Sequence, residues 1–266
     1  YQALGASVCA VADLDLDGVM DIAVGSRSLS SALHPEGSVT LYSGATLRPL
    51  RLIHGDLAAS EFGAAVLTVM DLDGDRLPDL AVGSPGRLGG RGRVGVHSSA
   101  TGALLAYWDG GTPGERFGTA LSGCFPRPAY SFGGPRSFLA SSASSQSASH
   151  QGSVRKFDLM VGREVARWDG LTLSREFSGA VCGAGLQDDD TFPDFLVGLR
   201  RWQGGTPQPA AVQLVSGDPA DLGKILWELG FPVGASASPG LVGLDRPWSR
   251  SPGFAVIPPR HSEAAV

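Results

Sequence analysis

The sequence predicts an all-β protein, a β-propeller made of four-stranded antiparallel blades. Three observations carry this prediction. An acidic nine-residue motif occurs twice, a short opening signature recurs every 54 to 60 residues, and short strand patterns bounded by glycine follow each signature. Repeats of roughly this length, each with four short strands, are typical of propeller blades. The spacing of the repeats therefore indicates the fold.

The opening signature divides the chain into units. It reads Leu4-Gly5 and Phe62-Gly63, and more loosely Phe117-Gly118, Phe177-Ser178 and Phe231-Pro232. The predicted units are 4–61, 62–116, 117–176, 177–230 and 231–266, and the last is too short for four strands. We therefore expect one domain over residues 1–266 that holds about four and a half blades and forms an arc of a larger ring.

The second strand of a unit follows the acidic motif. Residues 22–25 and 80–83 are continuous apolar runs that end in glycine. Each run is too short for a helix and has the form of a buried strand. The acidic motif therefore joins the first two strands of its blade.

The third and fourth strands come after a variable polar stretch. The predicted third strands alternate apolar and polar residues over 37–44, 92–99, 152–158 and 211–217. Period-two alternation with glycine at the boundary indicates a half-buried strand. A short turn then leads to the fourth strands, which end near residues 53–55, 108–110, 168–170 and 227–230.

The two acidic motifs predict cation sites. The ligands would be Asp13, Asp15, Asp17, Asp21 and the carbonyl of Val19 in the first motif, and Asp71, Asp73, Asp75, Asp79 and the carbonyl of Leu77 in the second. A solvated polar turn is the alternative, but it needs only one or two such side chains. At ~5 Å and an effective dielectric of ~20, each carboxylate pair would repel by ~3 kcal/mol. We therefore expect calcium, which binds oxygen ligands of this kind.

An EF-hand does not fit these motifs. That motif needs a glutamate at position 12 and a helix on each side, whereas Val24 and Val82 stand at position 12. Position 6, where glycine eases a sharp turn, is Gly18 in the first motif. In the second motif Arg76 stands there, and Gly74 at position 4 is expected to relieve the strain instead.

The later units depart from the acidic motif. The fourth unit keeps carboxylates at Asp188, Asp190 and Asp194 but places Leu186 at position 1, so we expect weak or no binding there. Residues 124–133 of the third unit and 243–250 of the fifth offer no ligand pattern. Two calcium sites are therefore expected.

With these motifs established, the chain resembles the FG-GAP repeat family, which forms the propellers of integrin α-subunits and of many secreted bacterial proteins. The resemblance rests on Phe62-Gly63, the acidic motif 71–79 and Leu80-Ala-Val-Gly-Ser-Pro85. It implies that calcium has a structural role and that the protein is extracellular, either secreted, as in the bacterial type, or at the cell surface. In integrins the end opposite the metal loops engages ligands, and the resemblance implies the same end here.

Composition narrows the class of function. A formal net charge of −5 without a basic stripe argues against nucleic acid as a partner. No apolar run approaches the ~18 residues that a membrane-spanning helix needs. Cys9 and Cys182 occupy the same offset in their units and are expected to be small core residues, and Cys124 is the third cysteine. Because the chain begins at Tyr1 and at a first strand, we expect a fragment or a processed product.

We therefore expect a calcium-stabilised adhesion or interaction module with a protein or glycan ligand. Arg200, Arg201 and Trp202 are the candidate partner-binding residues, because an aromatic side chain beside arginines suits an interface anchor. The alternative is that Trp202 folds over a blade edge. Two other functions stay open, an accessory domain of a larger secreted enzyme and a spacer in a surface protein. Catalysis in this segment is not indicated, since the five histidines lack ligand spacing and no nucleophile motif occurs.

Overall fold

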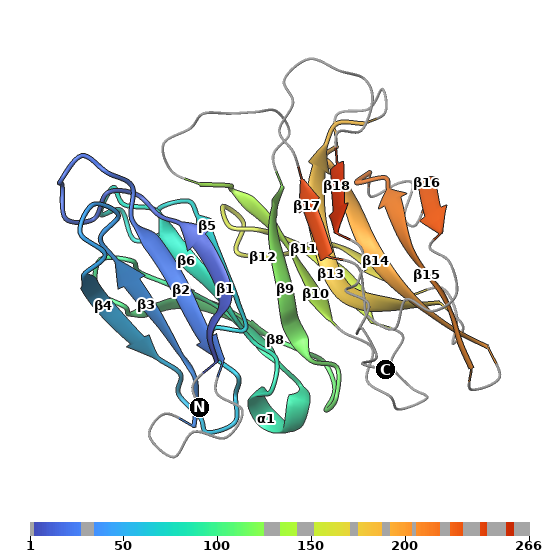
Figure 1. Cartoon of the computed structure of the whole chain (residues 1–266), viewed down its shortest axis with the longest axis horizontal. Coiled ribbons are helices and arrows are strands. Elements are labelled where there is room, and N and C mark those ends of the chain that lie inside the picture. Colours follow the sequence, from blue (N-terminus) through green and yellow to red (C-terminus); the bar gives the residue numbers. More distant parts are fainter. Residues whose placement is uncertain are drawn as a thin grey trace, which may run out of the picture.

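The computed structural model describes residues 3–27, 35–124, 134–142, 152–170, 175–187, 192–203, 206–218, 224–230, 240–243 and 254–257. These residues form four four-stranded sheets and one two-stranded sheet. The sheets follow one another in chain order, from the blue sheet at the N-terminal side to the orange and red strands near the C-terminus (Figure 1). The all-β propeller prediction is confirmed.

Each four-stranded sheet is a blade whose strands pair in chain order. The first blade contains β1 (Ala3–Ala10), β2 (Ile22–Arg27), β3 (Ser38–Tyr42) and β4 (Pro49–His54), and the second contains β5 (Ala65–Val69), β6 (Asp79–Ser84), β7 (Arg93–His97) and β8 (Leu104–Asp109). The third contains β9 (Phe117–Cys124), β10 (Ser137–Ser142), β11 (Ser153–Asp158) and β12 (Arg163–Asp169), and the fourth contains β13 (Arg175–Gly185), β14 (Asp194–Gln203), β15 (Thr206–Val215) and β16 (Ile225–Gly230). The fifth unit contributes the hairpin of β17 (Gly240–Gly243) and β18 (Phe254–Ile257).

Two elements differ from the prediction. A short helix, α1 (Arg87–Gly90), stands where only a polar loop was expected, and Leu88 and Gly89 inside it have left-handed backbone angles. Residues 200–202 fall in the variable polar stretch expected before the third strand of the fourth unit, but they belong to β14. The ladder between β14 and β15 continues past Leu199, with Arg201 opposite Gln208 and Trp202 opposite Pro207. Backbone pairing therefore overrides the polar, loop-like composition of this segment.

The hydrophobic core lies between the blades. Alternating side chains of a strand point to opposite faces of the sheet, so one set of residues packs on the preceding blade and the other on the following blade. The cluster between the first two blades contains Val11, Ala23, Val39, Leu41, Ile53, Phe62, Val66, Leu80 and Val82. This layered burial holds each blade in place.

Aromatic rings fill the boundary between the second and third blades. Phe138 and Phe157 stack with their ring centroids 5.2 Å apart. Trp108, from β8 of the second blade, reaches both rings, at 5.8 Å from Phe138 and 5.0 Å from Phe157. Large aromatic rings therefore fill the boundary between the second and third blades, whereas mostly aliphatic side chains fill the boundary between the first and second.

Cys9, Cys124 and Cys182 form no disulfide with one another. Cys9 and Cys182 pack beside separate hydrophobic clusters, as expected for small core residues. Cys124 is buried, and this burial raises the pKa of its thiol to about 12. The helices of the described residues include none that is long and apolar enough to cross a membrane.

Candidate metal loops

The two acidic motifs lie at the same end of neighbouring blades. The first connects β1 to β2, and the second connects β5 to β6. In both, the aspartate at position 9 stands at the start of the second strand, as Asp21 just before β2 and as Asp79 in β6. Both position-9 aspartates are fully buried, whereas the tips of the loops are exposed.

Each loop gathers three of its four carboxylates. One carboxylate oxygen each from Asp13, Asp15 and Asp21 lies within 4.8 Å of the others, and Asp71, Asp73 and Asp79 form the same arrangement. The position-5 carboxylates lie outside these groups of three. Asp17 Oδ1 accepts a hydrogen bond from Val19 N at 2.9 Å, and Asp75 Oδ1 accepts one from Leu77 N at 2.7 Å.

The first aspartate of each motif organises its own loop. Asp13 accepts hydrogen bonds from Asp17 N at 3.0 Å and Gly18 N at 2.7 Å. Asp71 accepts equivalent bonds from Gly74 N at 2.6 Å and Arg76 N at 2.8 Å. Backbone amides therefore hold the first carboxylate of each loop in place.

Both loops adopt a left-handed backbone at positions 4 and 6. In the first loop these residues are Leu16 (φ 61°) and Gly18 (φ 90°), and in the second they are Gly74 (φ 84°) and Arg76 (φ 74°). Each loop therefore has glycine at one of the two positions and a strained residue with a side chain at the other. Gly74 at position 4 was expected to relieve the strain of the turn in place of a glycine at position 6. It does so only in part, because Arg76 at position 6 still has a positive φ.

The position-9 aspartate joins two turns of its blade. Asp21 Oδ2 accepts a hydrogen bond from Leu14 N at 2.7 Å, and its Oδ1 accepts one from Gly44 N at 2.9 Å. Gly44 belongs to the turn between β3 and β4, so Asp21 ties the metal loop to that turn.

The position-9 aspartate of the fourth blade makes the same two contacts. We call such an aspartate, which accepts from both turns of its blade, a latch. Asp194 accepts hydrogen bonds from Gln187 N at 2.7 Å and Gly217 N at 3.0 Å. The sequence alone predicts Asp194 only as a weakened metal ligand. The sequence does contain a signal for this structural role. Position 9 is still an aspartate in the fourth unit, although position 1 is leucine and no longer a carboxylate.

Asp79 has the most perturbed carboxylate of the two loops. Burial raises its pKa to about 6, and the charges of Asp73 and Asp75 act in the same direction, while the backbone amides of Leu72 and Ser99 oppose the shift. Leu72 N donates to Asp79 Oδ2 at 2.7 Å. Asp79 Oδ1 is buried and accepts no hydrogen bond of normal geometry.

The donor set fits a hard divalent cation. All candidate ligands are oxygens, and calcium and magnesium prefer oxygen. The two exposed or partly exposed carboxylates of each group leave room for water, while the buried position-9 aspartate closes the site from the blade side. The gathered carboxylates repel one another without a counter-charge, so the same residues that form the site also favour its occupation.

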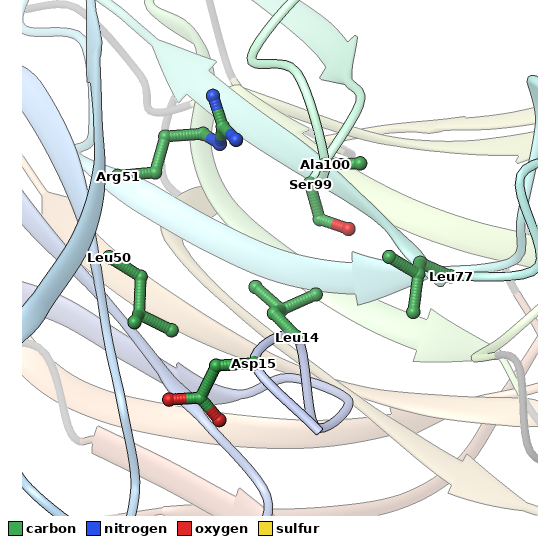
Figure 2. A pocket seen from close by; sticks show the side chains of 7 residues that line it. All are labelled: Leu14, Asp15, Leu50, Arg51, Leu77, Ser99 and Ala100. Carbon is green, nitrogen blue, oxygen red and sulfur yellow. The ribbon is translucent and has the colours of Figure 1, made fainter. Parts of the chain in front are cut away.

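A small pocket lies between the two loops (Figure 2). Its volume is about 280 Å³. It is lined by Leu14 and Asp15 of the first loop, Leu50 and Arg51 of β4, Leu77 of the second loop, and Ser99 and Ala100 of the turn after β7. The two metal loops and the turn between β7 and β8 therefore lie at the same end of the molecule.

The remaining candidate residues are only partly described. Asp188 and Asp190 lie outside the described residues, as do 125–133 of the third unit and 244–250 of the fifth. The backbone of Arg200, Arg201 and Trp202 is described within β14, and their side chains are not. The weakened third site and the partner-binding cluster therefore stay predictions.

Two ion pairs occupy the end opposite the metal loops, one between the segments that open the second and third blades and one within the second blade. Arg116, just before β9, donates to both carboxylate oxygens of Glu61 at 2.8 Å. Arg93 forms a two-pronged pair with Asp109, with Nε to Oδ1 at 2.6 Å and Nη2 to Oδ2 at 2.8 Å. This pairing lowers the pKa of Asp109. These pairs could not be predicted from the sequence, because their partners are 16 and 55 residues apart.

Comparison with known proteins agrees with this geometry. Residues 62–97, which include the second acidic motif, match the FG-GAP repeat. Integrin alpha-4 of Xenopus laevis is 32% identical over 122 residues, which cover 44% of this chain and 12% of that protein. Integrin alpha-5 of Xenopus laevis is 34% identical over 112 residues, which cover 38% of this chain and 10% of that protein. The chain thus matches about a tenth of the length of these relatives.

Two solved structures share the arrangement of strands. Hydrazine synthase of Kuenenia stuttgartiensis superposes with a TM-score of 0.55 at 11% identity, covering 91% of this chain and 53% of that one. The β-propeller domain of Cps50 (Swd1) from Myceliophteria thermophila has a TM-score of 0.50 at 13% identity, covering 90% and 59%. At such low identity these likenesses concern the fold alone.

Proposed function

We propose that this chain, an integrin-α-like propeller segment with an FG-GAP repeat, is a calcium-stabilised extracellular interaction module. Two cations would be held by the first and second loops, and the opposite end of the blades would meet a protein or glycan partner. The observation that carries the proposal is the pair of matching carboxylate groups, each with three oxygens within 4.8 Å. The similarity to integrin α-subunits supports an extracellular setting.

Calcium would act as a structural tie in this proposal. Open extracellular sites bind calcium with dissociation constants of about 10⁻⁴ to 10⁻³ M. At about 1 mM calcium and a dissociation constant of about 0.1 mM, each site would stabilise the fold by about 1.4 kcal/mol. The proposed sites are therefore useful where calcium is millimolar, as it is outside cells.

Thermal unfolding with and without calcium tests the metal sites. We expect a higher melting temperature in 1 mM calcium than in excess chelator. Asp15→Asn is the most informative variant, because Asp15 belongs to the first group of carboxylates and its side chain is exposed. It should reduce the calcium-dependent shift. In chelator the melting temperature should stay equal or rise, because the variant removes one of the carboxylates that repel one another.

The matched control is Asp169→Asn. Asp169 carries the same charge, its side chain is 62% exposed, and it pairs with Arg167 in the third blade. This variant should keep the full calcium-dependent shift. A melting temperature that does not respond to calcium or chelator in the unmodified protein would overturn the proposal.

The partner face is proposed on the end opposite the metal loops. Arg200, Arg201 and Trp202 stand near the β14–β15 connection, which lies at that end of the fourth blade. An interface anchor of this type commonly contributes more than about 1 kcal/mol to binding. A binding screen against cell-surface proteins and glycan arrays should therefore give a ligand whose affinity falls at least about fivefold in the Arg200→Ala and Trp202→Ala variants. Unchanged affinity in both variants would remove this patch from the proposal.

A further inference from the structure

Asp79 of the second blade makes only one of the two bonds of a latch. Its Oδ2 accepts from Leu72 N at 2.7 Å, as the aspartates of the first and fourth blades accept from their own acidic loops. Those two aspartates also accept at Oδ1 from the turn between the third and fourth strands, and we call this contact the turn bond. Asp79 Oδ1 is buried and has no hydrogen-bond partner among the described residues. The second blade therefore lacks the turn bond.

Strand register identifies the residue that should donate the turn bond in each blade. The residue after the position-9 aspartate pairs with a residue at the end of the third strand, and the donor lies two residues beyond that partner. The residues at this place, which we call the turn position, are Gly44, Ser99 and Gly217. The two blades with glycine there have the turn bond, and the blade with serine does not.

The turn that contains Ser99 is otherwise built like its counterpart in the first blade. Ser98 N donates to Ala103 O at 2.9 Å, and Gly102 N donates to Ser98 O at 2.8 Å. The two corresponding bonds of the first blade are both 2.9 Å long. A distortion of the whole turn therefore does not explain why the turn bond is missing, and the cause has to lie at the turn position itself.

The blades that have the turn bond leave no room for a Cβ atom at the turn position. A Cβ added to Gly44 would overlap the carbonyl oxygen of Met20, and one added to Gly217 would overlap that of Pro193. Met20 and Pro193 stand at position 8 of their motifs, directly before the latch aspartate. Neither glycine has a positive φ. Glycine is therefore required by the close approach of two backbones, and not by an unusual backbone conformation.

Ser99 places a side chain in this narrow space. Position 8 of the second motif is Pro78, just as it is Pro193 in the fourth unit, so these two blades differ at the turn position and not at position 8. Ser99 is 1% exposed, and its Oγ has no hydrogen-bond partner among the described residues. Its amide is near enough to lower the pKa of Asp79, yet it does not reach Oδ1 with normal geometry. The two groups are therefore neighbours that are held slightly apart.

The pocket between the two acidic loops lies beside the same place. Ser99 and Ala100 form part of its wall, and Leu77 of the second loop belongs to its lining as well (Figure 2). Well-packed protein interiors leave few spaces of this kind. Unfilled volume next to Ser99 is what we expect if the turn between β7 and β8 and the second acidic loop do not approach each other fully.

We propose that the residue at the turn position decides whether a blade forms its turn bond, and that the Cβ of Ser99 prevents this bond in the second blade. Ser99 is thus a positioning residue, which acts on the second acidic loop through Asp79. Glycine at position 99 lets the amide of that residue donate to Asp79 Oδ1. The proposal concerns the protein chain alone and does not depend on a bound cation.

Hydrogen exchange of single backbone amides tests this proposal. The rates are measured by NMR on the full chain in excess chelator, and each is compared with the rate of an unstructured peptide of the same sequence. Amides in stable hydrogen bonds exchange slowly, so Gly44 and Gly217 should be at least about tenfold better protected than Ser99. In the Ser99→Gly variant the protection of the residue-99 amide should rise at least about tenfold, and that of the other two amides should not change.

The matched control is Ser99→Ala, which removes the hydroxyl group and keeps the Cβ. Its residue-99 amide should exchange as fast as in the unmodified protein. Equal protection in Ser99→Ala and Ser99→Gly would assign the effect to the hydroxyl group and overturn the proposal. A residue-99 amide that still exchanges fast in Ser99→Gly would do the same, as would one that is already protected like Gly44 in the unmodified protein.

The reverse substitution tests the same rule in the first blade. Gly44→Ala places a Cβ against the carbonyl oxygen of Met20, so the protection of the residue-44 amide should fall at least about tenfold while that of Ser99 stays the same. Unchanged protection of residue 44 would contradict the proposal. Because every measurement is made in chelator, these results are independent of the calcium-dependent melting that tests the proposed function.

Discussion

The carboxylate of Glu115 meets the guanidinium of Arg155 inside the third blade. Their side chains are only 8% and 5% exposed. Glu115 also accepts hydrogen bonds from Ser142 Oγ at 3.1 Å and from the backbone of Gly111 at 2.5 Å. The Arg155 guanidinium lies 4.6 Å from the ring centre of Phe117. This pair therefore connects the linker before β9 to β10 and β11.

Removing the charge of Glu115 should be strongly destabilising. In a Glu115→Gln variant the buried guanidinium of Arg155 loses its counter-charge, which commonly costs about 3 to 5 kcal/mol. Urea unfolding of the variant measures this loss. Glu164→Gln is the control, because Glu164 Oε2 lies 3.8 Å from Arg155 and its side chain is 36% exposed. A loss below about 1 kcal/mol for both variants would contradict a structural role for the pair.

The left-handed positions of the metal loops make a prediction about backbone strain. Gly18→Ala and Gly74→Ala should each destabilise the protein by about 1 to 2 kcal/mol, because a residue with a Cβ resists positive φ. Steric overlap would not explain the loss, since nothing lies within 4 Å of a Cβ at either position.

Arg76→Gly is the matched comparison for these two substitutions. Arg76 already has a φ of 74°, so glycine would relieve strain there and the free energy of unfolding should stay equal or rise slightly. Chemical denaturation measures the free energy of unfolding of the three variants and tests whether backbone strain explains the differences. Equal losses at all three positions would rule out the backbone explanation.

The pKa of Asp79 predicts how stability without calcium depends on pH. Its folded value is about 6, against 3.8 for the free side chain. Because the folded state holds its proton to higher pH, stability should fall as pH rises from about 4 to about 6.5, by at most about 3 kcal/mol. Calcium should weaken this dependence, since a bound cation favours the charged form.

Thermal melts in chelator between pH 4 and pH 7 measure this effect. The comparison variant is Asp79→Asn, which removes the titrating group and keeps an oxygen that can accept from Leu72 N. His97 has a pKa lowered by burial, so its contribution runs the opposite way and is shared by both proteins. Identical pH profiles for the variant and the unmodified protein would exclude Asp79 as the source.

The latch role of Asp194 predicts a loss that calcium cannot restore. Asp194→Ala removes the acceptor for two backbone amides, Gln187 N in a part-buried bond and Gly217 N in a buried one. A buried amide left without an acceptor costs about 1 to 3 kcal/mol, so the melting temperature should fall by a similar amount in calcium and in chelator. A loss seen only in calcium would mean that Asp194 acts as a metal ligand instead.

The sequence by itself determined the repeat, the four-stranded units and the place of both acidic loops. These features depend on local patterns, such as apolar runs after position 9 and alternation in the third strands, and local patterns survive in a linear sequence. It also predicts the type of donor in both loops, because four aspartates within nine residues offer carboxylate oxygens.

Only the tertiary structure decided which role each aspartate of an acidic loop has. Asp13 and Asp71 organise the loops, Asp21 and Asp194 bind turns more than 20 residues away, and the position-5 aspartates lie outside the groups of three. The pair of Glu115 and Arg155 joins residues 40 apart in sequence. Which side chains meet between blades depends on how the sheets pack, and strand patterns alone do not predict that packing.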